Sequence, residues 1–124
     1  MDDEKKVILY IDDDPDYLDA VRVIVESGGY RMIEADSGES GLRMFKEQQP
    51  DLVIVDLMME EVDAGTQLVR ELQALGNQVP IYMLSSTGDN LAMTVDYGEL
   101  GLAGVFQKPI PPATLLTALK SKLS

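Results

Sequence analysis

Five polar residues of this chain follow stretches of apolar residues, at positions from which their side chains could act together. They are Asp12, Asp13, Asp56, Ser85 and Lys108. Three carboxylates gathered in one place repel one another and therefore favour a bound cation, and Mg²⁺ suits oxygen ligands of this kind. A lysine and a hydroxyl beside such a cation can bind the oxygens of a phosphoryl group. These residue types predict phosphoryl chemistry supported by a hard cation.

The apolar stretches that precede these residues are expected to be the strands of one parallel sheet. Val7–Ile11 and Leu52–Val55 are continuous apolar runs, which is typical of strands buried on both faces. Further strands are predicted at 30–35, 80–84 and 103–107. Because the carboxyl ends of parallel strands meet at one edge of an open sheet, all five polar residues are expected to meet there.

Helical patterns alternate with the predicted strands. Asp14 and Pro15 predict the start of a helix, with Asp14 as its N-cap, and Gly28 and Gly29 predict its end. Strand followed by helix, five times over, predicts an α/β domain whose doubly wound parallel sheet of five strands is flanked by five helices. The other helices are expected at about 37–48, about 64–75 with Leu68, Leu72 and Leu75 on the apolar face, about 89–97, and from Pro111-Pro112 onward.

The composition restricts the class of function. The 124 residues suit one domain covering 1–124, without internal linkers. Cysteine and histidine are absent, which excludes disulfides, thiolate metal sites and an imidazole base. The net charge of −12 would repel nucleic acid and anionic lipid, so neither is expected to bind this domain. An acidic start without a signal peptide, and the lack of a membrane-spanning apolar run, lead us to expect a cytoplasmic protein.

The order and spacing of these residues resemble the receiver domain of two-component response regulators, over essentially the whole chain. The resemblance implies the flavodoxin-like receiver fold, of which the single-domain chemotaxis regulator is the archetype. The matching features are Asp12-Asp13 after the first strand, Asp56 with the following Leu57-Met58-Met59, Ser85 at the end of the fourth strand, and Lys108-Pro109 after the fifth.

The resemblance also implies a role for each acidic residue. Asp56 would be the phosphoacceptor, taking a phosphoryl group from the phosphohistidine of a histidine kinase or from a phosphotransfer protein. Asp13, Asp56 and the backbone carbonyl of Met58 would bind Mg²⁺ directly, and Asp12 would act mainly through a bound water.

Lys108 and Ser85 would bind the phosphoryl group itself. By the same resemblance, Lys108 would pair with one phosphoryl oxygen, and Ser85 would donate a hydrogen bond to another. Such a domain catalyses only its own phosphorylation and dephosphorylation, so an enzyme with an independent substrate is not expected. An aspartyl phosphatase of the haloacid-dehalogenase type would need a carboxylate at position 58, where this chain has Met.

Two departures from the family pattern concern the loop after Asp56 and the switch aromatic. Glu60 stands where most receivers have proline, and Ala64 stands at the usual glycine position. The family's aromatic lies three residues before the lysine, where this chain has Val105, and the aromatic here is Phe106. Side chains alternate along a strand, so Phe106 is expected to face away from Val105, which questions the usual switching route.

The output of the domain is expected to be a protein contact. Receivers commonly use the face made by the helix expected at 89–97, the fifth strand and the last helix. The 89–97 segment carries two apolar stripes, which indicate either an output partner or second copy on this face, or a short helix partly buried all round. The alternative function is that of a degenerate receiver, a protein-interaction module that works without phosphorylation.

Overall fold

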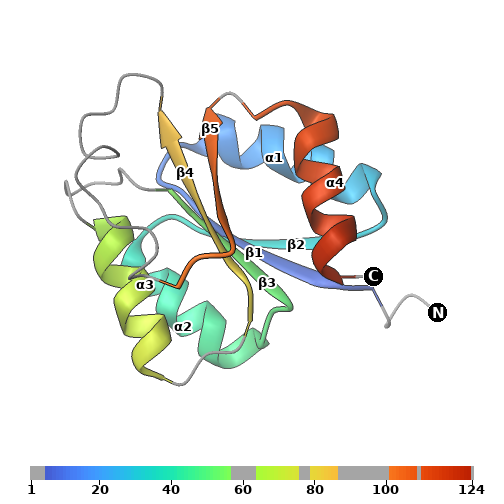
Figure 1. Ribbon diagram of the computed structural model, residues 1–124. Helices are drawn as coiled ribbons and strands as arrows, with labels where there is room; N and C mark the ends of the chain where they lie inside the picture. Colours follow the sequence, from blue (N-terminus) through green and yellow to red (C-terminus); the bar gives the residue numbers. More distant parts are fainter. Residues whose placement is uncertain (1–4, 57–63, 76–78, 87–100, 109, 124) are drawn as a thin grey trace.

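Strands and helices alternate along the chain and form one sheet with helices on both faces (Figure 1). The computed structural model describes residues 5–56, 64–75, 79–86, 101–108 and 110–123. Within these ranges the strands are β1 (Val7–Ile11), β2 (Arg31–Ala35), β3 (Leu52–Asp56), β4 (Ile81–Ser86) and β5 (Gly104–Lys108). The helices are α1 (Pro15–Ser27), α2 (Gly38–Gln48), α3 (Ala64–Ala74) and α4 (Pro112–Leu123).

The sheet has the strand order β2-β1-β3-β4-β5, and all neighbouring strands are parallel. From β1 the chain winds first to one side, to β2, and then to the other, through β3 to β5. The crevice of such a sheet lies where this direction reverses, between β1 and β3. The predicted doubly wound α/β fold is confirmed, and the fifth predicted helix, at 89–97, lies outside the described residues.

Each face of the sheet packs against a pair of helices. Even-numbered residues of β1 and β3 pack towards α1 and α4, and odd-numbered residues pack towards α2 and α3 (Figure 1). Residues 8–11 of β1 and 52–55 of β3 are fully buried, which explains why these strands are continuous apolar runs in the sequence. No helix in the described parts of the chain is both long and apolar enough to cross a bilayer.

Side chains cap the starts of α1 and α2, and the cap of α1 is the predicted Asp14. Asp14 is the N-cap of α1, and its side chain accepts hydrogen bonds from the backbone N–H groups of Asp16 and Tyr17. Ser37 caps α2 in the same way by accepting from the N–H of Ser40. Because α1 begins directly after β1, its cap fixes the first helical turn, including Tyr17, next to the end of that strand.

The end of α3 differs from the prediction. Leu68 and Leu72 are buried against the sheet as expected, but Leu75 is 51% exposed. The helix ends at Ala74, so Leu75 lies beyond its last turn. Helical spacing no longer determines the direction of that side chain, and the prediction for Leu75 is wrong.

A close contact between α2 and β1 lies just below the end of β1. Gly41 is a buried residue of α2, and a Cβ added there would lie 2.6 Å from Cδ1 and 2.9 Å from Cγ1 of Ile11. Ile11 is itself fully buried and immediately precedes Asp12. The glycine therefore lets α2 approach the strand end that carries the acidic pair.

Replacing this glycine is expected to destabilise the fold. Gly41→Val should lower the free energy of unfolding by about 2 kcal/mol, because the added carbons overpack a filled core. Urea denaturation would measure the change. Gly38→Val is the matched control, because no atom lies within 4 Å of a Cβ at Gly38 in the same helix. Equal stability of the two variants would contradict the close contact.

Candidate functional site

Asp12, Asp56 and Lys108 share one face at the carboxyl edge of the sheet. Asp56 ends β3 and Lys108 ends β5, while Asp12 follows β1 directly. Side chains alternate along a strand, so Asp12 lies on the same face as Tyr10, and Lys108 on the same face as Phe106. This is the α1 and α4 face of the sheet. Strand periodicity thus explains why three distant residues converge.

Asp12 is a fully buried carboxylate that accepts from three donors. Its Oδ1 accepts a hydrogen bond of 3.0 Å from the backbone N–H of Asp14. Its Oδ2 accepts a hydrogen bond from the hydroxyl of Tyr10 and lies 3.0 Å from Nζ of Lys108. A buried charge is costly unless it is paired and hydrogen-bonded, and Asp12 meets both conditions.

Lys108 is the counter-charge of two buried carboxylates. Its Nζ lies 3.0 Å from Oδ2 of Asp12 and 3.3 Å from Oδ2 of Asp56, and the Asp56 side chain is 4% exposed. The ammonium also lies over the ring of Tyr17, 4.5 Å from the ring centroid. Burial lowers the pKa of Lys108, but the hydrogen bond to Asp12 and the attraction of Asp56 outweigh it, so the pKa is raised.

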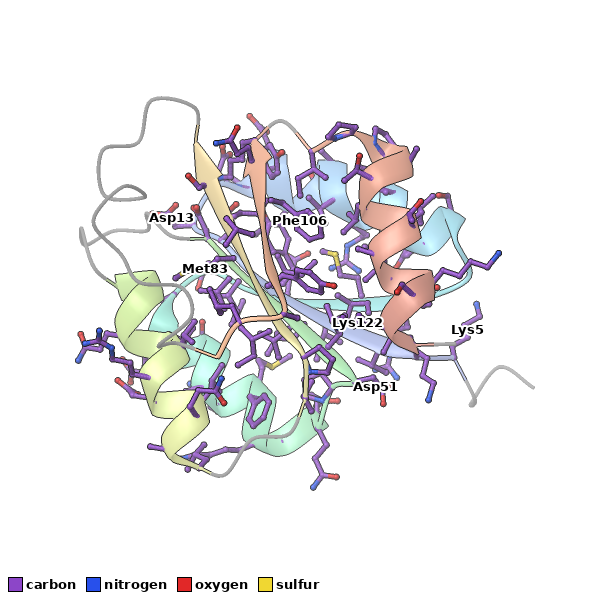
Figure 2. All side chains as sticks on the ribbon, in the orientation of Figure 1. Lys5, Asp13, Asp51, Met83, Phe106 and Lys122 are labelled. Atoms are coloured by element: carbon purple, nitrogen blue, oxygen red, sulfur yellow. The ribbon has the colours of Figure 1, made fainter. Side chains whose placement is uncertain are left out.

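Asp13 adds a third carboxylate at the surface of the site. One oxygen from each of Asp12, Asp13 and Asp56 lies within 4.8 Å of the others. Asp13 is exposed, and it lines a pocket of about 540 Å³ between the start of α1, the end of β2 and α2. In Figure 2 it lies at the end of the sheet opposite Lys5, Asp51 and Lys122. The acidic group therefore reaches solvent through Asp13.

The donor set of this acidic group fits a hard divalent cation. Three carboxylates and one lysine leave negative charge in excess, and all the ligand atoms are oxygens. Oxygen ligands from one or two carboxylates are typical of Mg²⁺ sites, which also retain waters. The structure thus brings together Asp12, Asp13 and Asp56 as the sequence predicted, with Lys108 beside them.

Of the two remaining predicted site residues, Ser85 is described by the structure and Met58 is not. Ser85 is 2% exposed and lies one position beyond Leu84, which is the register partner of Asp56 on β4. It therefore lies at the edge of the sheet from which Asp56 projects. Met58 and its carbonyl lie outside the described residues, as does Glu60.

Two tyrosines of the site were not anticipated from the sequence. Tyr10 is fully buried, and burial together with its hydrogen bond to Asp12 raises its pKa, so the phenol remains a donor. The Tyr17 ring packs edge-on against it, with centroids 6.5 Å apart. A tyrosine two residues before a strand-end aspartate shares its face, and this spacing is the signal that could have revealed Tyr10.

The aromatic of β5 faces α1 and α4, as its position predicted. Phe106 stacks on Tyr82, with ring centroids 4.8 Å apart, and packs against the core beneath α1 and α4. Figure 2 shows Phe106 on this side of the sheet and Met83 on the side of α2 and α3. Val105 is 37% exposed. The prediction that Phe106 and Val105 face opposite ways is confirmed.

Comparison with known proteins identifies the family. The sequence model of the response regulator receiver domain matches residues 8–120. The chain belongs to this family. Transcriptional regulatory protein GlrR of Escherichia coli is 34% identical over 94% of the receiver, which covers 26% of that protein. Transcriptional regulatory protein AfsQ1 of Streptomyces coelicolor is 30% identical over 94% of the receiver, which covers 50% of that protein.

Solved structures of other receiver domains share this fold. A response regulator receiver domain from Clostridium thermocellum superposes with a TM-score of 0.85 at 27% identity, covering 95% of this receiver and 94% of that chain. The BeF₃-activated N-terminal receiver domain of RstA from Klebsiella pneumoniae gives a TM-score of 0.83 at 26% identity, covering 95% and 98%. The receiver domain of a two-component response regulator is thus the function class of this chain.

The charge pairing of Lys108 predicts how stability depends on pH. Its pKa is higher in the folded than in the unfolded receiver, so its contribution is complete below the unfolded value of about 10.4 and is lost as the pH rises through the folded value. The raised pKa of Tyr10 acts in the same direction. The free energy of unfolding, measured in urea, should therefore fall above about pH 10.

Lys108→Met tests the origin of this fall. It should lower the stability at neutral pH by about 3 kcal/mol, because two buried carboxylates lose their counter-charge, and it should flatten the loss at high pH. Lys122→Met, at an exposed lysine in the last turn of α4, is the control. An alkaline fall of the same size in Lys108→Met and the wild type would contradict the assignment.

Proposed function

We propose that this receiver accepts a phosphoryl group on Asp56 with the help of Mg²⁺. The observation that supports the proposal is the position of Asp56, whose Oδ2 lies 3.3 Å from Nζ of Lys108 within a group of three carboxylates. The donor would be the phosphohistidine of a histidine kinase or of a phosphotransfer protein. In the reaction a carboxylate oxygen of Asp56 forms the new bond to phosphorus, while the bond from phosphorus to the imidazole nitrogen breaks. The electron pair stays on that nitrogen.

The residues of the receiver would position and neutralise the charges of this transfer. Phosphoryl transfer depends mainly on positioning and on electrostatic stabilisation. Lys108 would bind one phosphoryl oxygen, and Ser85 would donate a hydrogen bond to another. Asp12 would keep Lys108 in place, since Asp12 is itself fixed by Asp14 and Tyr10.

Asp13, Asp56 and the carbonyl of Met58 would bind Mg²⁺, with Asp12 acting through a water. The ion would neutralise charge on the phosphoryl oxygens. The exposed position of Asp13 would allow the ion to enter from solvent. After transfer, the phosphoryl group would add about −1.5 to −2 charge beside Lys108. We propose that this charge shifts the receiver between inactive and active populations.

The proposed partners follow from the two-component class. A histidine kinase or phosphotransfer protein would act upstream, and an output domain or separate target downstream. GlrR and AfsQ1 are named as transcriptional regulators, and the receiver covers only 26% and 50% of them, so a transcriptional output is a proposal for this chain. A cytoplasmic location, and the absence of any substrate beyond the receiver's own phosphorylation, stay predictions.

The alternative of a phosphorylation-independent module has no observation in its favour. A degenerate receiver is expected to lack part of the acidic group or the lysine. Here Asp12, Asp13, Asp56 and Lys108 are all present and lie together. The phosphoacceptor function is therefore preferred.

Incubation with acetyl phosphate and Mg²⁺ tests the phosphoacceptor. Intact-protein mass spectrometry should detect a single phosphoryl adduct on the wild type, because acetyl phosphate donates a phosphoryl group without a kinase. Asp56→Asn should abolish the adduct by removing the attacking carboxylate. Asp19→Asn, at an exposed position of α1, is the matched control and should keep it. An adduct of unchanged amount on Asp56→Asn would sink the assignment of Asp56.

Mg²⁺ should stabilise the receiver against urea. A ligand that binds only the folded state adds RT ln(1 + [L]/Kd), or about 1.4 kcal/mol at ten times the Kd. Asp13→Asn should lose this increment, and Asp36→Asn, an exposed aspartate outside the acidic group, should retain it. Equal stabilisation of the two variants by Mg²⁺ would place the ion elsewhere.

A further inference from the structure

Tyr17 contacts the site from the first turn of α1. Its ring face lies 4.5 Å from Nζ of Lys108, measured to the ring centroid. Its hydroxyl accepts a hydrogen bond of 2.9 Å from the backbone N–H of Ile110. The ring also packs edge-on against Tyr10, which donates to Asp12. The Tyr17 side chain thus contacts Lys108, the backbone of Ile110 and the ring of Tyr10.

The position of Lys108 is determined from two sides. On one side lie the carboxylates of Asp12 and Asp56, at 3.0 and 3.3 Å from Nζ. On the other side lies the Tyr17 ring, whose negative face attracts a cation. An ammonium that loses the ring contact would still have its charge partners, but it would be free to occupy more positions near them.

Ile110 links the site to α4. It lies two residues after Lys108, is 6% exposed, and packs in the core beneath α1 and α4. The chain enters α4 at Pro112, where the N–H of Leu115 bonds to the carbonyl of Pro111. The hydrogen bond from Ile110 therefore ties Tyr17 to the segment that leads into this helix.

We propose that Tyr17 is a positioning residue of the phosphoryl site, which fixes Lys108 against Asp12 and Asp56 and couples its position to the start of α4. The proposal rests on the proposed function of Asp56. When Lys108 turns towards a phosphoryl oxygen on Asp56, its contact with the Tyr17 ring changes. Because the Tyr17 hydroxyl accepts from Ile110, the change passes to the segment that enters α4.

The residues of β5 favour coupling through Tyr17 over coupling through an aromatic residue of β5. Val105, at the position of the family's switch aromatic, has no ring that could rotate. Phe106 stacks on Tyr82 in the core instead of facing the same side as Val105. The Tyr17 ring, by contrast, lies in contact with Lys108. The coupling therefore leaves the site on the α1 side of the sheet.

Two substitutions separate the two contacts of Tyr17. Tyr17→Leu removes both the ring and the hydroxyl, while Tyr17→Phe keeps the ring over Lys108 and removes only the acceptor for Ile110. The matched controls are Tyr30→Leu and Tyr30→Phe, because Tyr30 is also half-buried and precedes β2 at the opposite end of the sheet. Urea denaturation of all four variants would show whether each one folds.

The first measurement is the rate of phosphorylation by acetyl phosphate with Mg²⁺, followed by intact mass. The wild type should form the adduct, and Tyr17→Leu should slow its formation by about threefold to tenfold, as expected for loss of a partly buried cation–π contact. Tyr17→Phe should be slowed less, and the Tyr30 variants should match the wild type. A wild type that forms no adduct refutes the proposed function, and the inference with it.

The second measurement is the NMR spectrum of the backbone amides, recorded with and without BeF₃⁻ and Mg²⁺. In the wild type the Ile110 amide and those of the first turn of α4 should shift on addition of BeF₃⁻. In Tyr17→Phe these changes in chemical shift should fall by more than half, although BeF₃⁻ still binds at Asp56. The inference is overturned if Tyr17→Leu reacts at the wild-type rate, or if Ile110 responds fully in Tyr17→Phe, even when the wild type forms its adduct normally.

Discussion

The site depends on the attraction between one ammonium and two buried carboxylates. Asp12 and Asp56 have almost no exposure, and their charges would repel each other across adjacent strands. Lys108 lies within 3.3 Å of both and makes their burial tolerable. The same lysine is the group proposed to bind the phosphoryl oxygen. Under the proposed function, the residue that stabilises the resting site would also be the one whose partner changes when Asp56 accepts the phosphoryl group.

Much of the fold could be predicted because sequence patterns report burial directly. Runs such as Val7–Ile11 are apolar throughout because both faces of β1 are covered, and Asp14-Pro15 begins α1 because an N-cap and a proline suit the first turn. Convergence of the polar residues then followed from the parallel order of the strands. Leu75 was misplaced because helical spacing holds only as far as the helix itself extends.

Burial patterns alone do not reveal the polar roles of the two tyrosines. Tyr10 was one apolar residue in a continuous run, and only the structure shows its hydroxyl directed to Asp12. Tyr17 lies in the first turn of a helix, where its direction depends on how α1 packs on the sheet. Both side chains are apolar along most of their length and polar at the tip, so burial patterns describe the ring and miss the hydroxyl.

The ion pair between Lys108 and Asp56 also links two strands that are not neighbours in the sheet. β5 is the last strand of the sheet, and neighbouring strands lie about 4.8 Å apart, so the Lys108 side chain has to cross the end of β4 to reach Asp56 on β3. The ion pair thereby helps to hold the edge strand β5 against the centre of the sheet. A force or a binding partner that loosened β5 would withdraw the positive charge from the crevice. Separation of β5 from the sheet and loss of the Asp56 counter-charge would therefore occur together.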